Sequence, residues 1–585
     1  MRCFPSRSLF SSFLLSGVAF FALCASLSCG SGSEIVSRLE ARLKDTADSG
    51  RQEATPDEIE QAIASQLRVA PVPAKGSEMP SSPTFPTRQT LREFYANRGQ
   101  SLAWCDESGV TLPSVRTFLE ALSRAEEHGL DPEDYGLSSL ERMGQSMLAA
   151  HESKVSVAHW ADFDLLMTTA FFRYASDLST GRVHPDEIRT EWHTEFPEPD
   201  LPASLDRALQ EGSLEKLLER LPPPHPGYAQ LREGLMDLRS VEDAGGWPVV
   251  SEGPDLKRGA RGPRVATLKQ RLLASANDAP DREIFDAALD ERVRVFQRLH
   301  GIEPDGVVSK STLAELNVPV ERRIRQVGLN MERWRWIPRH LGEPYVEVNI
   351  PGFELKLVRD GRAELRSRIV VGQAFTPTPV FNDQIVAVVA NPPWNVPETL
   401  AVREYLPELK EDPQGFLRHG IRIYENAAED EREVDPASVR WARVDEDEFK
   451  YHLRQDPGPD NALGQVKFQL TNDFQIYLHD TPARTLFAQT DRDLSHGCIR
   501  VEKARDLANE ILGDSSQKLE EALESEEEKH IQVRPPVQVQ ILYLTAWMDE
   551  EGALRFSPDV YEFDVAQLAA LDRASRAASS DKRKL

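Results

Sequence analysis

A cysteine and two histidines lie in one short stretch of the chain, IYLHDTPARTLFAQTDRDLSHGCIRV, residues 476–501. The alternating run at its start predicts a strand on which Tyr477 and His479 share one face. Further along, Ser495-His496-Gly497 bends the chain and presents Cys498. An imidazole within hydrogen-bond reach of a thiol favours the thiolate and can later return the proton to a leaving amine. Taken alone, this pair favours a buried, inert cysteine, with a cysteine nucleophile as the alternative.

The residues that follow Cys498 bear on how its thiol would be activated. The segment IRVEKARDLANEIL has helical apolar spacing at Ala504, Leu507 and Ile511. We therefore expect Cys498 at or near a helix start, where the positive end of the macrodipole stabilises a thiolate. Gly497 permits a close approach of the backbone, so N–H groups at this turn could stabilise an oxyanion.

The elements that must position these residues belong to a mainly β region, residues 343–565. Period-two patterns in residues 345–372, 384–397 and 464–480 predict its strands. A charged, irregular block at residues 398–459 interrupts them. An insertion of this kind in a β domain predicts a cap beside the site.

The middle of the chain has helical rather than strand periodicity. Residues 85–250 predict a helical region, and FDLLMTTAFFRYASDLSTGRVHP (163–185) is its clearest helix. Residues 251–318 predict a compact unit of three short helices with glycine turns. A connecting helix is expected within 319–342, and a charged helical tail at 566–585.

The N-terminus predicts export. Basic residues, an apolar run and small residues within 1–28 are typical of a signal segment, with a retained transmembrane helix as the alternative. The sequence SLSC resembles a lipoprotein signal, which implies that Cys29 is lipidated and anchors the chain at the membrane. Residues 29–84, rich in Ser, Glu, Ala and Pro, predict a flexible tether with a helix near 57–67. We expect the protein in the periplasm or cell envelope.

Composition narrows the possible functions. The length of 585 residues suggests about three to four domains. A formal net charge of −26 argues against general affinity for nucleic acid or anionic membranes. Of five cysteines, few remain once the signal is removed, so a disulfide framework is not expected.

The string His479…Ser495-His496-Gly497-Cys498-Ile499-Arg500 closely resembles the signature of the L,D-transpeptidase catalytic domain, a strand histidine followed by (S/T)-(H/S)-G-C-(I/V)-(R/N). Residues 370–397, 454–468 and 543–552 extend this match. The helical region resembles the scaffold of large multidomain members, and residues 256–317 resemble their peptidoglycan-binding module. The resemblance covers most of residues 90–565. It implies a multidomain α + β protein: a helical scaffold, a three-helix module and a sandwich-like catalytic domain with a capping insertion.

The same resemblance implies roles for individual residues and a reaction. Cys498 would be the nucleophile and His479 the general base and acid. His496 and Gly497 would shape the oxyanion hole, Ser495 would form the turn, and Arg500 would anchor the substrate or brace the loop. Tyr477 and Trp394 would line the peptide groove. The implied reaction joins a donor tetrapeptide stem of peptidoglycan to an acceptor amine in a 3→3 cross-link, with release of D-Ala and no cofactor. Carbapenems are implied inhibitors.

Three other functions remain open from the sequence. Water could replace the acceptor amine, which would make the protein an L,D-carboxypeptidase. His479, His496 and Cys498 could instead bind zinc in a metallopeptidase, although no accompanying ligand motif supports this. A non-catalytic wall-binding protein would rest on residues 256–317 alone.

Overall fold

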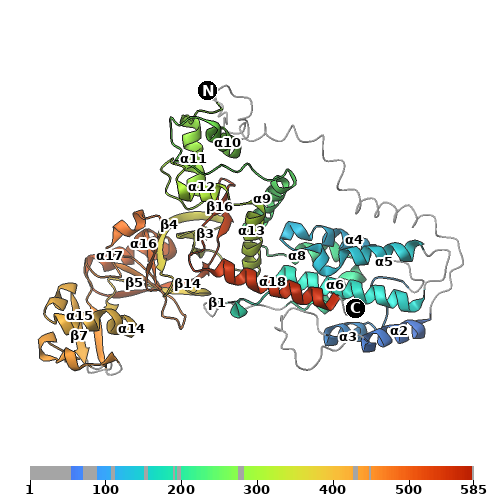
Figure 1. Cartoon of the computed structure of the whole chain (residues 1–585). Helices are drawn as coiled ribbons and strands as arrows, with labels where there is room; N and C mark the ends of the chain where they lie inside the picture. The colour runs from blue at the N-terminus through green and yellow to red at the C-terminus, as the bar shows by residue number, and fades with distance from the viewer. Residues whose placement is uncertain are drawn as a thin grey trace, which may run out of the picture.

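The computed structural model describes residues 55–69, 88–106, 112–149, 156–188, 192–193, 199–273, 282–425, 432–446 and 449–582. The predicted signal segment and Cys29 lie outside these residues. Within them, no helix has the length and apolar character that crossing a membrane requires. Figure 1 shows helices α2–α8 on one side of the molecule, the strands on the other, and α10–α12 at the top.

A helical bundle forms the first part of the described chain. The long helix α6 is its centre, because Phe163, Met167 and Phe171 are buried on a face that the shorter helices cover. Buried Asp164 on the same helix accepts hydrogen bonds from the Tyr95 hydroxyl at 2.7 Å and from two backbone N–H groups. The helices are α2 (Pro56–Val69), α3 (Arg88–Asn97), α4 (Pro113–Ser123), α5 (Leu137–Ala149), α6 (Val157–Thr180), α7 (Leu201–Glu211), α8 (Leu214–Arg220) and α9 (Pro226–Asp243).

Helix α2 lies within the predicted tether of residues 29–84. Ile59, Ile63 and Leu67 recur at helical spacing and are buried in the core of the bundle against α6. The helix expected near 57–67 is present, and this part of the predicted tether is packed onto the bundle.

The three-helix unit consists of α10 (Pro263–Leu272), α11 (Ala287–Leu299) and α12 (Lys310–Leu316). The side chains of Asp286 and Ser309 cap the N-termini of α11 and α12 by accepting from backbone N–H groups. Leu268, Val293 and Leu316, one from each helix, meet in a separate small core. We call this unit the module.

The β domain contains a sheet that closes on itself. Its order is β1-β5-β10-β11-β13-β4-β3-β2-β14, and the long β14 also pairs with β5. One face holds the apolar core, which α16 and α17 cover. The strands are β1 (Trp192–His193), β2 (Tyr345–Asn349), β3 (Glu354–Arg359), β4 (Arg362–Gly372), β5 (Val380–Ala390), β10 (Val466–Gln469), β11 (Leu478–His479), β12 (Asp493–Ser495), β13 (Ile499–Val501) and β14 (Lys529–Leu542), and the helices are α16 (Ala504–Leu512) and α17 (Ser516–Glu524).

The insertion predicted to be irregular is a small folded subdomain, which we call the cap. Its sheet has the order β6-β9-β7-β8. Leu409, Phe416 and Trp441 belong to its own buried core. Its elements are β6 (Trp394–Asn395), α14 (Glu398–Leu400), the π-helical η6 (Ala401–Tyr405), α15 (Leu406–Glu411), η7 (Gly415–His419), β7 (Ile421–Glu425), β8 (Arg432–Glu433) and β9 (Tyr451–Gln455).

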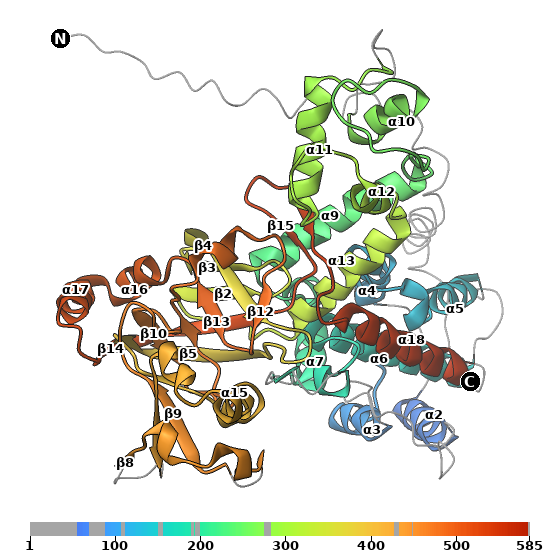
Figure 2. The same ribbon diagram turned by 60° about the vertical axis from the view of Figure 1, so that its left-hand side comes forward.

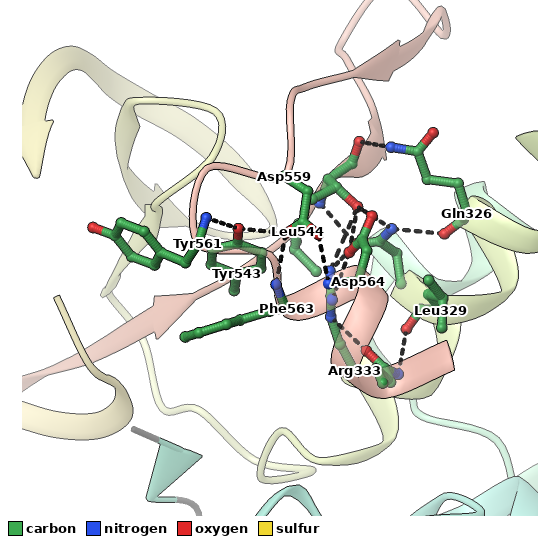
Figure 3. Close-up of polar contacts among 12 residues, drawn as sticks. Gln326, Leu329, Arg333, Tyr543, Leu544, Asp559, Tyr561, Phe563 and Asp564 are labelled. Carbon is green, nitrogen blue, oxygen red and sulfur yellow. Dashed lines mark hydrogen bonds and ion pairs between the residues drawn. The ribbon is translucent and has the colours of Figure 1, made fainter. Parts of the chain in front are cut away.

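Two helices join the bundle to the β domain, α13 (Val320–Arg335) and α18 (Phe563–Lys582). Arg333 on α13 forms a buried ion pair with Asp564 at 2.6 Å and donates to Gln567 on α18 (Figure 3). Next to this pair, the Tyr543 hydroxyl donates to Asp559 and accepts from the N–H of Tyr561 (Figure 3). Because buried charges must be paired, these contacts fix α13, α18 and the end of β14 together.

Candidate active site

The strand register brings the chemistry-bearing residues to one face of the sheet. Leu478 pairs with Ile499 and His479 with Arg500 in the parallel ladder of β11 and β13, so Tyr477 lies across from Cys498. Lys467 on β10 pairs with His479 from the other side. Leu478 and Ile499 are buried in the core, and therefore the alternating neighbours lie on the opposite face. The predicted shared face of Tyr477 and His479 is confirmed.

The Cys498 thiol is half-buried and has two hydrogen-bond partners. Its Sγ lies 3.7 Å from the carbonyl oxygen of Gln475 and contacts the hydroxyl of Tyr477. Burial raises the pKa of the thiol, while hydrogen bonds from Tyr477 and the positive charges of Lys467 and Arg500 oppose this rise. In this arrangement the resting sulfur is a protonated thiol near neutral pH.

His479 is buried and neutral. Its Nδ1 lies 2.6 Å from the carbonyl oxygen of Asp480, and because a carbonyl only accepts, Nδ1 carries the proton. Burial, helped by the charge of Arg500, lowers the pKa of the imidazole to about 3. The backbone of Leu463 forms a second hydrogen bond with the ring. Among the described contacts of the sulfur, the partners are Gln475 and Tyr477 and not His479.

The expected helix start at Cys498 is wrong. Cys498 is followed by β13, and α16 begins only at Ala504. Because the effect of the macrodipole falls off within a helix's first turn, it does not act on this thiol. Lys467 and Arg500 supply the positive charge instead.

The turn before Cys498 is held by side-chain hydrogen bonds. Ser495 Oγ accepts from the N–H of Gly497 at 3.2 Å and donates to the carbonyl of Cys498 at 2.6 Å. Thr378 Oγ1 donates to the carbonyl of Gly497 at 2.7 Å and accepts from the N–H of Gly372 at 2.9 Å. Gly497 has a φ of +115°, and a Cβ there would lie 3.3 Å from the side chain of Ile476. Both the conformation and the space therefore favour glycine.

The cap reaches the site at two points. Trp394 packs against the core of the cap and hydrogen-bonds to the hydroxyl of Tyr477. Nε2 of His496 lies 2.7 Å from a carboxylate oxygen of Glu404 on η6. His496 thus faces the cap rather than the sulfur. The groove role of Trp394 stays a prediction.

Three residues of the site were not singled out from the sequence. Lys467 alternates with buried Val466 and Phe468, a signal that places it on the same face as His479. Thr378 and Glu404 approach Gly497 and His496 through tertiary contacts that no local pattern encodes.

The second described cysteine, Cys105, and the alternative of a zinc site remain to be placed. Cys105 is buried in the helical bundle with an unpaired thiol whose pKa burial raises. Across the described ranges, no three His, Cys, Asp or Glu side chains are grouped as metal ligands. The zinc alternative therefore has no ligand cluster in this part of the chain.

Comparison with known proteins identifies the domains. Residues 343–539 match the L,D-transpeptidase catalytic domain, residues 89–235 a scaffold domain, and residues 261–316 a "Putative peptidoglycan binding domain". The β domain thus matches the L,D-transpeptidase catalytic domain over most of its length. The chain is a multidomain protein built around it, as the sequence signature predicted.

Individual relatives agree with this assignment. The chain is 39% identical over 244 residues to a "Putative L,D-transpeptidase" of Haemophilus influenzae, an alignment that covers 41% of this chain and 48% of that protein. The chain therefore spans less than half the length of that curated relative.

Two solved structures were also matched. One is the L,D-transpeptidase from Xylanimonas cellulosilytica, which is 16% identical to this chain. The match covers 50% of this chain and 99% of that chain, and its TM-score is 0.17. The other is the Ldtfm–avibactam carbamoyl enzyme, with 12% identity, coverages of 53% and 98%, and a TM-score of 0.18. Scores this low establish no structural relationship for the whole chain.

Proposed function

We propose that the protein is a peptidoglycan L,D-transpeptidase that forms 3→3 cross-links through a thioester on Cys498. The observation that carries the proposal is the row of Tyr477, His479, Cys498 and Arg500 on one face of two paired strands within an L,D-transpeptidase catalytic domain. The substrates are a donor tetrapeptide stem and the side-chain amine of an acceptor stem.

The first step is formation of the acyl-enzyme. When donor binds, Sγ of Cys498 leaves the Gln475 carbonyl, and its proton passes to Nε2 of His479. The sulfur attacks the carbonyl carbon that joins the third stem residue to D-Ala. The C–N bond breaks, the imidazolium returns its proton to the leaving amine, and D-Ala departs.

The second step releases the product. The acceptor amine attacks the thioester carbonyl and His479 takes its proton. The C–S bond then breaks and the imidazolium returns the proton to the sulfur, which gives the cross-link and the free thiol. A neutral imidazole with its proton fixed on Nδ1 suits both transfers. The oxyanion has a candidate donor in the N–H of Cys498 itself, since that of Gly497 already donates to Ser495.

Arg500 is suited to hold a carboxylate of the stem. Its guanidinium is half-buried beside His479, and its Nε is shielded from solvent without an acceptor among the described residues. A planar guanidinium pairs with a carboxylate through two parallel hydrogen bonds. Such a pair would orient the donor in front of the thiol.

Mass spectrometry of the protein with purified wall fragments tests the proposal. We expect D-Ala release, a transient acyl adduct on Cys498 and a 3→3 dimer. Cys498→Ala should abolish all three, whereas Cys105→Ala should retain most activity because that thiol is buried in another domain. Trimmed stems without dimer would assign an L,D-carboxypeptidase, and equal loss in the two variants would refute Cys498 as nucleophile.

Carbapenems provide an independent readout of the same thiol. Their strained lactam carbonyl should acylate Cys498 and add the mass of one drug molecule to its peptide. An adduct on Cys105 instead would contradict the assigned site.

A further inference from the structure

A cleft of about 750 Å³ separates the module from the catalytic domain. The module contributes the end of α11 and the turn at residues 301–304. The catalytic domain contributes residues 351–353, the loop 487–492 and the hairpin of β15 (Ala546–Met548) and β16 (Leu554–Phe556). Figure 2 shows α11 beside this hairpin, near the β3–β4 side of the sheet. The volume lies in the range of ligand sites, about 300–1,000 Å³.

Contacts between residues that line the cleft hold its two walls together. Thr490 Oγ1 donates to Glu303 of the module at 3.0 Å. Arg555 donates through Nη2 to the carbonyl of Arg298 at 3.3 Å. A Cβ on Gly301 would lie 3.3 Å from Pro558, so the turn packs closely against the segment after β16. The cleft is therefore a preformed feature of the two joined domains.

The two glycine turns of the module, at Gly259–Gly262 and Asp305–Gly306, do not line this cleft. The N–H groups of Gly259 and Gly262 donate to carbonyls of the module. The side chain of Asp305 and the N–H of Gly306 are bonded to Gln297. These groups stabilise the module, and the site available to a ligand lies at the adjacent turn.

The lining of the cleft is balanced in charge. Four arginines and four carboxylates face it, together with the apolar Phe353, Phe487 and Pro558. Equal numbers of both signs give no attraction to a polyanion. They match a ligand that carries both carboxylates and an ammonium group along a partly apolar backbone.

The cleft also adjoins the active site along the chain. Residue 492, at its edge, precedes Cys498 by six positions, and six residues span at most about 22 Å. The N–H of Val371 on β4 donates to the carbonyl of Arg492 at 2.9 Å, which fixes this loop to the sheet that carries the site. The cleft and the thiol are thus carried by the same sheet.

We propose that this cleft binds a second stem peptide of peptidoglycan, with the module and the catalytic domain each supplying one wall. Stem peptides carry free carboxylates and an amine, which is the amphoteric chemistry that the lining matches. The ligand identity rests on the proposed function. The site then positions the polymer in front of Cys498 without taking part in the chemical step.

The test measures binding in the inert Cys498→Ala protein, so that it is independent of turnover. Arg298→Glu reverses a charge on the module wall, and Ala553→Trp fills the cleft from the hairpin. Arg292→Glu makes the same charge change on the same helix outside the cleft. Thermal melts verify folding, and the probes are purified sacculi and a soluble disaccharide-tetrapeptide.

We expect each cleft variant to weaken binding of both probes about tenfold or more, and Arg292→Glu to change it less than twofold. Should Ala553→Trp not fold, Arg298→Glu decides alone. Parental affinity in a folded cleft variant would overturn the proposal. If peptide-free glycan bound as tightly as the two probes, and the cleft variants lost that binding too, the stem-peptide assignment would be overturned. A failure of Cys498 acylation by wall fragments would refute the proposed function separately, because it leaves these binding results unchanged.

Discussion

At the scale of single residues, the site keeps the Cys498 thiol protonated and the His479 imidazole neutral. Burial raises the pKa of the Cys498 thiol and lowers that of His479 to about 3. A preformed thiolate–imidazolium pair would require the opposite shifts. The proposed mechanism therefore transfers the proton as the sulfur attacks, not before.

Lys467 should govern how readily the thiol ionises. Its charge favours the thiolate, so Lys467→Met should raise the pKa of Cys498 further. Alkylation by iodoacetamide, which follows the thiolate, should rise with pH to a midpoint above the usual value of about 8.5 in the parent protein and still higher in the variant. The exposed Lys518→Met is the control. An unchanged midpoint in Lys467→Met would show that this charge does not reach the sulfur.

His479→Ala should lower turnover by about 10²–10⁴-fold, the usual contribution of a positioned general base. The measurement is D-Ala release from a soluble tetrapeptide donor under single-turnover conditions. His496→Ala should have a smaller effect, because that side chain contacts Glu404 on the cap. A near-parental rate in His479→Ala, with a large loss in His496→Ala, would reverse the two assignments.

The limits of sequence reasoning at this scale have a physical cause. Alternation identified the shared face of Tyr477 and His479, because a strand's period is fixed by its geometry. The helix predicted at Cys498 failed because apolar spacing from Ala504 onward marks a helix without marking where it begins. The roles of Thr378 and Glu404 depend on segments that meet only in the folded chain.

At the scale of elements, the segment between β4 and β5 supports the catalytic turn. The Tyr561 hydroxyl lies 2.5 Å from the carbonyl of Gly372 and 3.3 Å from the N–H of Thr378. Thr378 in turn holds Gly497. The position of the residue before Cys498 is therefore set by side chains from two other parts of the β domain.

Thr378→Val should impair acylation of Cys498 without creating a cavity, because valine and threonine have similar volumes. It leaves the carbonyl of Gly497 and the N–H of Gly372 without their hydroxyl partner, at a cost of about 1–3 kcal/mol. We expect carbapenem acylation of Cys498 to slow about tenfold and the melting temperature to fall. Thr168→Val, a buried hydroxyl in the helical bundle, is the matched control. Equal slowing in both variants would mean that lost stability, not the turn, is responsible.

The cap shows what insertion patterns can and cannot reveal. Its position beside the site was predicted from its place between strands of the β domain. Its own sheet and core were not, because short strands such as Trp394–Asn395 and Arg432–Glu433 carry too few residues to display a period.

At the scale of the whole molecule, the domains are joined by buried polar contacts rather than by flexible linkers alone. Arg333 binds α18, and Arg335 forms a buried ion pair with Glu332 while donating to the carbonyl of His128 in the bundle. Breaking a buried pair of this kind typically costs about 3–5 kcal/mol. The scaffold and the catalytic domain should therefore behave as one unit.

The module is attached differently, and its removal separates wall binding from chemistry. Its entry and exit lie side by side, because Trp247 Nε1 donates to the carbonyl of Val318 at 2.9 Å and the backbone of Val250 bonds to Asn317. Residues 251–318 can thus be replaced by a short Gly-Ser linker without stretching the chain. We expect this deletion to lower pelleting with insoluble peptidoglycan more than it lowers turnover of a soluble tetrapeptide donor, since Cys498 and His479 lie on strands of the catalytic domain.

Deletion also uncovers Phe556, against which His300 of the module and Arg323 of α13 pack. A Phe556→Gln change in the deleted protein controls for self-association through that surface. If turnover of the soluble donor disappeared while pelleting remained, the module would be a structural support for the catalytic domain. If pelleting were lost while turnover of the soluble donor was retained, the module would be assigned to wall binding. The strands that carry Cys498 and His479 are complete without the module.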